Sequence, residues 1–129
     1  MDDMQPVNLT EALASFDDVY SPRIVARVND YDVRIAHTLG EHVWHVHEHT
    51  DEFFLVLDGE LSIAVRDPDE RVVSLTPGQV FVVPRGIYHR PFSDAGASID
   101  VIEPAGIPTT GDHHDPIPDH ITTHTGLEV

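Results

Sequence analysis

The sequence predicts an all-β sandwich or barrel preceded by a short helix, and two observations lead to this prediction. From Arg23 onward, apolar and polar residues alternate with the period of two that is typical of strands. Turn sequences recur about every 8–12 residues, a spacing that favours an all-β fold over strand–helix–strand units. The chain has 129 residues, which is the usual length of one domain.

The N-terminal segment, residues 1–22, is predicted to contain the helix. Asn8 and Glu11 have the spacing of a capping box, in which Asn8 is the N-cap and Glu11 reaches back to it. Three apolar residues then fall on one helix face: Leu9, Leu13 and Phe16. We expect this helix to pack on the main body or on a neighbouring subunit.

The predicted strands occupy residues 23–104, and an irregular tail occupies residues 105–129. The strand sequences are RIVARV, YDVRIAHTL, HVWHV, EFFLVL, LSIAVR, RVVSL, VFVVP, IYHRPF and ASIDVIE. Asp58-Gly59 is a strong hairpin signal, and SDAG at residues 93–96 also predicts a turn. The tail is rich in Pro, Gly, Thr, Asp and His with little periodicity, so we expect it to be partly ordered at best.

Composition narrows the possible partners and cofactors. The formal net charge is -16, and an acidic surface repels phosphate backbones and anionic lipids, so we expect neither nucleic-acid nor membrane partners. No apolar run approaches the ~20 residues of a membrane span, and the start MDDMQPVNL does not resemble a signal peptide. We therefore expect a cytoplasmic protein. Because the chain has no cysteine, nitrogen and oxygen ligands would have to hold any metal.

The stretch WHVHEHTDE, residues 44–52, concentrates histidines and acids just before an apolar strand. His45 and His47 lie two apart, so on a strand both would point to the same face, opposite Trp44. Glu52 begins the next strand and could complete a metal site with them. Burying these groups without partners would cost several kcal/mol, which a bound cation would offset. The histidine pair alone also fits ordinary surface or hydrogen-bonded residues.

Two motifs in sequence order closely resemble those of the cupin family. The first, written G(X)5HXH(X)3-4E(X)6G, matches Gly40, His45, His47, Glu52 and Gly59. The second, PG(X)5PXG(X)2H(X)3N, matches Pro77, Gly78, Pro84, Gly86 and His89. Two positions differ from the family pattern: four residues separate Gly40 from His45, and Ser93 replaces the final Asn.

The resemblance implies a cupin double-stranded β-helix, a jelly-roll barrel, with one divalent transition metal inside. The implied ligands are His45, His47, Glu52 and His89, and the ion would be iron, manganese, nickel, zinc or cobalt. His49 creates a second possible register with His47. We prefer the pair His45 and His47, because four residues then precede Glu52, and we expect His49 to be solvated in a loop.

Three functions stay open at this point. The first is a metal-dependent enzyme, such as a dioxygenase or an isomerase or epimerase, acting on a sugar, keto acid or enediol. The second is a non-catalytic module that binds a small ligand, and the third is a metal-free structural barrel. Small cupins resembling this one often carry a sugar-phosphate-isomerase-like label, but the chain has no Lys, and only Arg85 and Arg90 flank His89. We expect both arginines to form surface salt bridges and the tail histidines to be solvated. No catalytic residue is identified, and the family resemblance suggests a homodimer.

Overall fold

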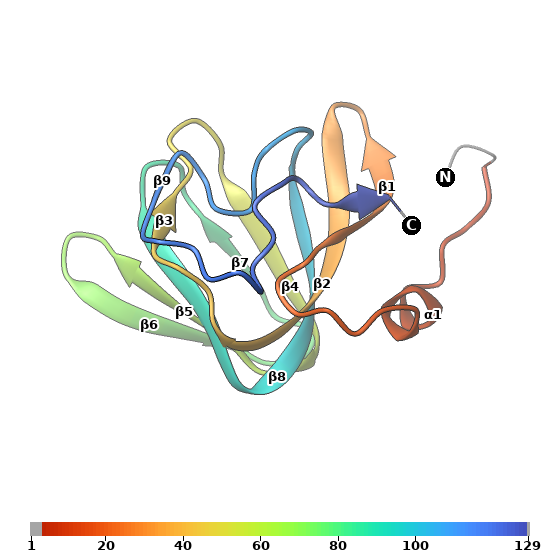
Figure 1. The fold of residues 1–129 in the computed structure, drawn as a ribbon, viewed down its shortest axis with the longest axis horizontal. Coiled ribbons are helices and arrows are strands. Elements are labelled where there is room, and N and C mark those ends of the chain that lie inside the picture. The colour runs from red at the N-terminus through yellow and green to blue at the C-terminus, as the bar shows by residue number, and fades with distance from the viewer. Residues whose placement is uncertain (1–3, 129) are drawn as a thin grey trace.

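The computed structural model describes residues 4–128. The ends of the predicted N-terminal segment and tail, residues 1–3 and 129, lie outside the described residues. Figure 1 shows one helix and the strands that follow it. The elements are α1 (Leu9–Ala14), β1 (Arg23–Val28), β2 (Tyr31–Glu41), β3 (His45–Val46), β4 (Glu52–Gly59), β5 (Leu61–Arg66), β6 (Glu70–Leu75), β7 (Val80–Val83), β8 (Tyr88–Pro104), β9 (His113–His114) and β10 (Leu127–Glu128).

The long strand β8 joins two sets of strands. Its second half pairs with β2 and β4, and this set continues to β1 and β10 on one side and to β7 on the other. Its first half pairs with β3, β5 and the end of β2, and β3 and β5 continue to β9 and β6. The all-β cupin barrel with a short N-terminal helix is therefore confirmed.

The predicted turn at residues 93–96 is wrong, because β8 continues through this segment. Thr38 of β2 pairs with Ala97, whereas Gly40 pairs with Ser93, so three residues of β8 stand opposite one residue of β2. The segment is therefore a bulge that bends β8 from one set of strands into the other. A second difference concerns HVWHV, of which only His45 and Val46 are strand.

The core lies between the two sets of strands, and its position follows from the alternation along each strand. From Glu52 to Val56, every second residue of β4 is buried, so Glu52 shares the inner face of Phe54 and Val56. The buried apolar residues come from β2 and β4 to β8: Ala36, Phe54, Val56, Leu61, Ile63, Val65, Leu75, Val83, Ala97, Ile99 and Val101. This arrangement places a carboxylate directly beside an apolar interior.

Helix α1 packs on the main body, which is the first of the two expected positions. Asn8 caps it as predicted, and its side chain accepts a hydrogen bond from the Glu11 N–H at 2.9 Å. Ala12 forms a cluster with Val25 and Ile35 on the outside of β1 and β2. Among the described residues, no helix has the length and apolar character needed to cross a membrane.

The tail passes back over the barrel near β3 (Figure 1). Most of it is irregular, since β9 and β10 contain two residues each. Asp112 and Asp115 donate their backbone N–H groups to the carbonyls of Val46 and Trp44, at 2.8 and 3.0 Å. Ile121 is buried beside residues that precede β1 and β3, so the tail closes one end of the barrel near the predicted metal ligands.

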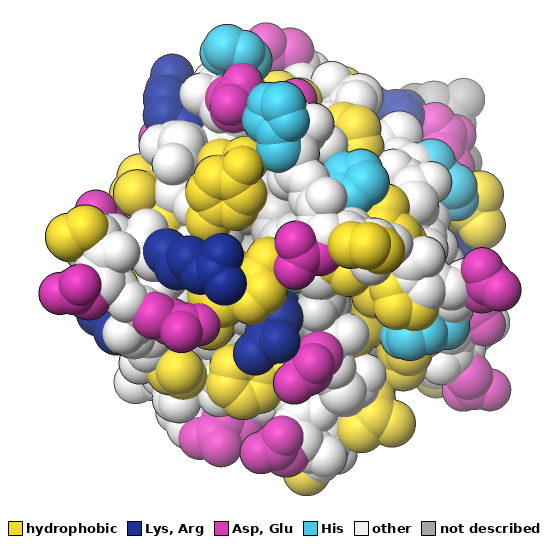
Figure 2. Space-filling model, turned by 60° about the vertical axis from the view of Figure 1, so that its left-hand side comes forward, with side chains coloured by type: hydrophobic (Ala, Val, Ile, Leu, Met, Phe, Trp, Pro, Cys, Tyr) yellow, Lys and Arg dark blue, Asp and Glu magenta, His cyan; other side chains and the backbone are white. Residues whose placement is uncertain are grey.

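Acidic side chains are spread over the face shown in Figure 2, as the net charge predicts.

The guanidinium carbon of Arg66 lies 3.7 Å from the centre of the Trp44 ring, and Arg90 approaches the same ring at 5.4 Å. Trp44 is thus buried on the outer side of β3, where arginines cover it. Its side chain points away from that of the following residue, His45, as strand alternation predicts.

Candidate metal centre

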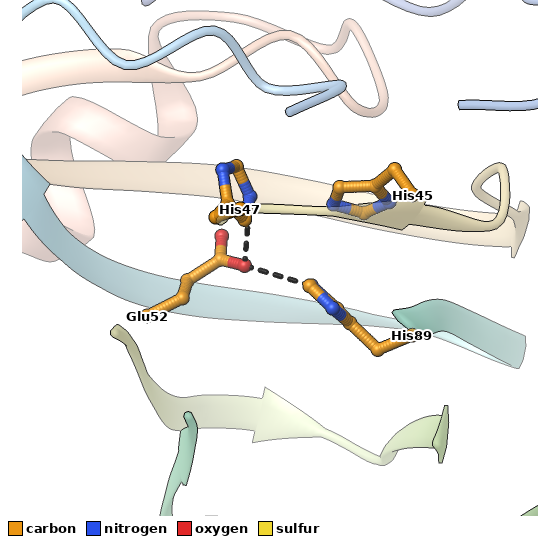
Figure 3. Close-up of side chains that lie close together, drawn as sticks. All are labelled: His45, His47, Glu52 and His89. Carbon is orange, nitrogen blue, oxygen red and sulfur yellow. Dashed lines mark hydrogen bonds and ion pairs between the residues drawn. The ribbon is translucent and has the colours of Figure 1, made fainter. Parts of the chain in front are cut away.

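Three strands bring the four predicted ligands together inside the barrel (Figure 3). His45 and His47 come from β3 and the residue after it, Glu52 begins β4, and His89 lies near the start of β8. One ligand atom from each residue lies within 4.8 Å of all the others. All four side chains are buried. Atoms around an ion with bonds of about 2.1 Å stand roughly 3–4 Å apart, so small side-chain movements would close such a shell.

Backbone carbonyls fix the tautomers of two of the histidines. Nδ1 of His45 lies 2.8 Å from the Val43 carbonyl oxygen, and Nδ1 of His89 lies 3.0 Å from that of Ile87. A carbonyl oxygen only accepts hydrogen bonds, so each Nδ1 must carry the hydrogen and donate it. In a neutral ring, Nε2 then presents its lone pair to the centre, which is the form that binds metals.

Glu52 faces two of these imidazoles. Its Oε1 lies 3.0 Å from Nε2 of His89 and 3.3 Å from Nε2 of His47 (Figure 3). A lone pair on nitrogen and a carboxylate oxygen repel each other unless a proton or a cation lies between them. The arrangement therefore fits either a proton shared with Glu52 or a metal ion that replaces it.

His47 supports the metal alternative. Its Nδ1 lies 3.7 Å from Glu103 Oε2, which is too long for a hydrogen bond. Within residues 4–128, neither nitrogen of His47 has a hydrogen-bond partner that meets normal geometry. Buried polar atoms without partners are rare in proteins, and they often mark the place where an ion binds.

Burial and neighbouring charges shift the pKa values in this region in different directions. Burial alone would raise the pKa of Glu52, but contacts with His47 and His89 outweigh it and hold that pKa well below its usual range. Burial, together with His89 and His42, holds the pKa of His45 well below its ordinary value. The centre therefore contains a carboxylate anion beside a neutral imidazole, which is the protonation state required of metal ligands.

A cavity of about 60 Å³ opens beside these residues. Its apolar wall includes Phe54, Ile99 and Val101, and its polar lining includes His45 and Glu52. Sequence reasoning missed five other polar residues that line it: Tyr20, Arg34, His42, Glu103 and Thr109. Burial lowers the pKa of His42 to about 4, so this ring is neutral at pH 7.

Arg34 and Glu103 are the most informative of the missed residues. Both side chains are almost fully buried, with exposures of 2% and 1%. Burial, together with the charge of Glu52, raises the pKa of Glu103 well above its usual range, and Arg34 offsets this only in part. The period of two in β2 places Arg34 on the same face as Ala36, so the position was readable from the sequence once the inner face was known.

The other residues considered from the sequence lie outside the centre. His49 is exposed, as expected of a loop residue, and so are the tail histidines at 113, 114, 120 and 124. Arg85 forms an exposed ion pair with Asp51, with Nε 3.1 Å from Oδ1. Arg90 points outward and lies 3.4 Å from Glu41. Neither arginine lines the cavity beside the candidate ligands.

The four residues therefore fit a divalent metal, and the ligand set of three imidazoles and one carboxylate suits transition ions. An ion held there would polarise a bound carbonyl or hydroxyl, lower the pKa of bound water or, if redox-active, react with dioxygen. The protein side chains would fix its position, and the surrounding apolar wall would limit access of water.

Comparisons with known proteins agree with this geometry. Residues 33–102 match the Cupin domain family. The "Uncharacterized protein YdbB" of Bacillus subtilis is 41% identical over 66 residues, which cover 51% of this chain and 57% of that protein. The match thus spans little more than half of that relative's length.

Solved structures extend the likeness. A cupin-2 domain containing protein from Shewanella frigidimarina is 38% identical, with a TM-score of 0.72 over 76% of this chain and 93% of that one. Hydroquinone 1,2-dioxygenase from Sphingomonas sp. TTNP3, in complex with 4-nitrophenol, is 23% identical, with a TM-score of 0.71 over 79% of this chain and 33% of the enzyme. This second likeness shows a shared fold alone. From its domain match and its similarity to the Shewanella protein, the chain belongs to the cupin family.

Proposed function

We propose that the chain is a cupin enzyme that depends on one divalent transition metal and acts on a small polar organic substrate. The proposed ligands are His45, His47, Glu52 and His89, and the proposed ion is iron, manganese, nickel, zinc or cobalt. The supporting observation is the convergence of their ligand atoms within 4.8 Å in a buried centre, with two Nδ1 atoms held by carbonyls.

The surroundings of the centre favour a small substrate without a phosphate group. The adjoining cavity of about 60 Å³ is largely apolar, and a phosphosugar would need clustered cationic donors. Arg85 and Arg90 are engaged with acids on the surface. A keto acid or enediol therefore fits better than a sugar phosphate.

Two reaction classes follow from this proposal. A redox-active ion would support dioxygenase chemistry, and any of the proposed ions would support isomerisation or epimerisation next to a carbonyl. The hydroquinone 1,2-dioxygenase from Sphingomonas sp. TTNP3 shows that a protein sharing this fold carries out oxygen chemistry. The identity of the bound ion and the assays below separate the two classes.

The test is turnover by protein reconstituted separately with iron, manganese, nickel and zinc. Oxygen uptake would report dioxygenase activity, and proton NMR in heavy water would report exchange next to a carbonyl. We expect turnover of a small keto acid or enediol that is lost in His47→Ala and retained in His49→Ala, because only His47 lies in the centre. Metal binding with no turnover across such a panel would contradict the enzyme proposal and leave a ligand-binding module.

We further propose that each chain consists of an N-terminal helical segment (1–22), a cupin barrel (23–104) and an irregular C-terminal tail (105–129). We also propose that the chain forms a homodimer in the cytoplasm. The dimer proposal is supported by β7, which pairs with β4 alone among the described strands and exposes Val80 and Val82. Sedimentation at micromolar concentration tests it, and a monomer there would contradict it. Fractionation of cells tests the location.

A further inference from the structure

Arg34 lies inside the barrel on β2, where its ladder partner is Val101 of β8. Its side chain is 2% exposed and lines the same cavity as His45 and Glu52. A cation in this position is unusual, because moving a charged side chain from water to a protein interior is costly unless it is fully paired. The site described above makes no use of it.

The N–H donors of the Arg34 guanidinium have hydrogen-bond or ion-pair partners only in part. Nη1 lies 3.4 Å from Glu103 Oε1, and Nη2 lies 3.7 Å from Asp32 Oδ2. Within residues 4–128, neither Nε nor Nη2 has a hydrogen-bond partner. A guanidinium carries five N–H donors in a planar fork that matches a carboxylate. Buried donors are therefore available beside the cavity.

The charges around Arg34 leave room for an anion. Asp32 is shared with Arg27, whose Nε lies 3.0 Å from Asp32 Oδ1. Arg27 is half-exposed and also pairs with Glu128, with Nη2 2.7 Å from Oε1, so it belongs to the surface rather than to the interior. Asp32 lies closer to Arg27 than to Arg34, and Glu103 lies 3.4 Å from Arg34, so neither acid pairs closely with the buried guanidinium. A divalent ion beside Glu52 would add positive charge to the interior, which a monoanion would offset.

We propose that Arg34 anchors the carboxylate of a small organic acid while a second oxygen of the same molecule faces His45 and Glu52. This inference rests on the proposed function and narrows its substrate class to short 2-oxo or 2-hydroxy monocarboxylates. The cavity of about 60 Å³ excludes large ligands, and its apolar wall of Ala36, Phe54, Ile99 and Val101 suits a short carbon chain. Phosphate fits less well, because Arg34 is the only Arg among the residues that line this cavity in the described chain.

The test measures binding, so it does not require turnover. The whole chain, loaded with redox-inert zinc, is titrated calorimetrically with pyruvate, lactate and acetate, each beside its neutral amide. Inorganic phosphate is titrated as well. We expect at least one 2-oxo or 2-hydroxy acid to bind at least about 10-fold more tightly than its amide and than phosphate, because charge-assisted bonds are the strong ones. Equal affinity for acid and amide, or tighter binding of phosphate, would overturn the proposal.

Variants then assign the effect to Arg34. Arg34→Gln should weaken binding of the acid by about 10- to 100-fold. Arg85→Gln removes an exposed arginine and should change nothing. The double variant Arg34→Gln/Glu103→Gln removes the buried cation together with one acid that faces it, so it guards against misfolding caused by unpaired charge. Undiminished binding of the acid by either folded Arg34 variant would overturn the proposal.

Zinc content is measured on the same samples, which separates this inference from the proposed function. If the wild type holds no zinc, the metal proposal fails and the titrations are repeated on the metal-free chain. Acid binding that depends on Arg34 would then support the anchor by itself. If the metal-free chain did not bind the acid, or bound it equally well with and without Arg34→Gln, the proposed anchor would be overturned.

Discussion

Replacing Gly59 with Ala tests how closely β4 and β8 approach each other at the end of the barrel. Gly59 pairs with Ala97 and has a φ of +77°, in the left-handed region. A Cβ added there would lie 2.3 Å from the carbonyl oxygen of Gly96 and 2.8 Å from Cα of Ala97. The left-handed conformation costs about 1–2 kcal/mol for a residue with a Cβ, and overpacking against backbone adds about 1–3 kcal/mol. We expect Gly59→Ala to lower the free energy of unfolding by about 3 kcal/mol.

Gly78→Ala is the matched control. Gly78 has a similar φ of +86°, but an added Cβ would meet no atom within 4 Å among the described residues. Only the conformational cost of about 1–2 kcal/mol applies there. Urea denaturation of metal-free protein, followed by fluorescence of the single tryptophan, Trp44, measures both variants. If the two variants differed by less than about 0.5 kcal/mol, the close contact between β4 and β8 would be refuted.

Two further perturbations test parts of the structure away from the candidate ligands. Burial raises the pKa of Asp100 to about 6, above its usual value near 3.9, so its ionisation destabilises the fold as the pH rises through 6. Asp100→Asn should thus exceed the wild type in free energy of unfolding by about 1 kcal/mol at pH 8, after allowance for solvent screening, and match it closely at pH 4. Urea titrations at both pH values check this, and equal differences at the two would contradict it. Arg66→Ala should uncover the Trp44 ring, shift its emission to the red and cost about 1 kcal/mol of stability. Arg71→Ala, on the exposed part of β6, is the control, and an equal red shift in both variants would refute the stacking.

Much of the fold was readable from the sequence because its strands are half-buried. Strands β1 and β5 coincide with the predicted segments RIVARV and LSIAVR, since alternation identifies a strand with one face inward. Two spaced motifs also predicted which four residues converge, and the structure brings them within 4.8 Å. Their role as ligands stays a prediction.

The errors arose where local sequence does not determine the environment. SDAG has the composition of a hairpin turn, but pairing with β2 on both sides of it keeps β8 continuous, and the segment becomes a bulge. In YDVRIAHTL, the sequence predicts a strand but does not indicate which face points inward. The structure turns Asp32 and Arg34 inward, where Glu103 faces Arg34. Only the pairing of β2 with β8 reveals this, and that pairing joins residues far apart in the sequence.

If the buried histidines and Glu52 hold a metal, the isolated protein contains about one ion per chain. The most direct test is the metal content of untagged protein, measured by mass spectrometry for the wild type, His47→Ala and His49→Ala. His49 is the matched control, because it is a neighbouring histidine that is exposed and lies outside the centre. We expect about one ion per chain in the wild type and in His49→Ala, and a large loss in His47→Ala. Absence of metal from all three after reconstitution with iron, manganese, nickel and zinc, or equal content in all three, would show that these residues do not hold a metal.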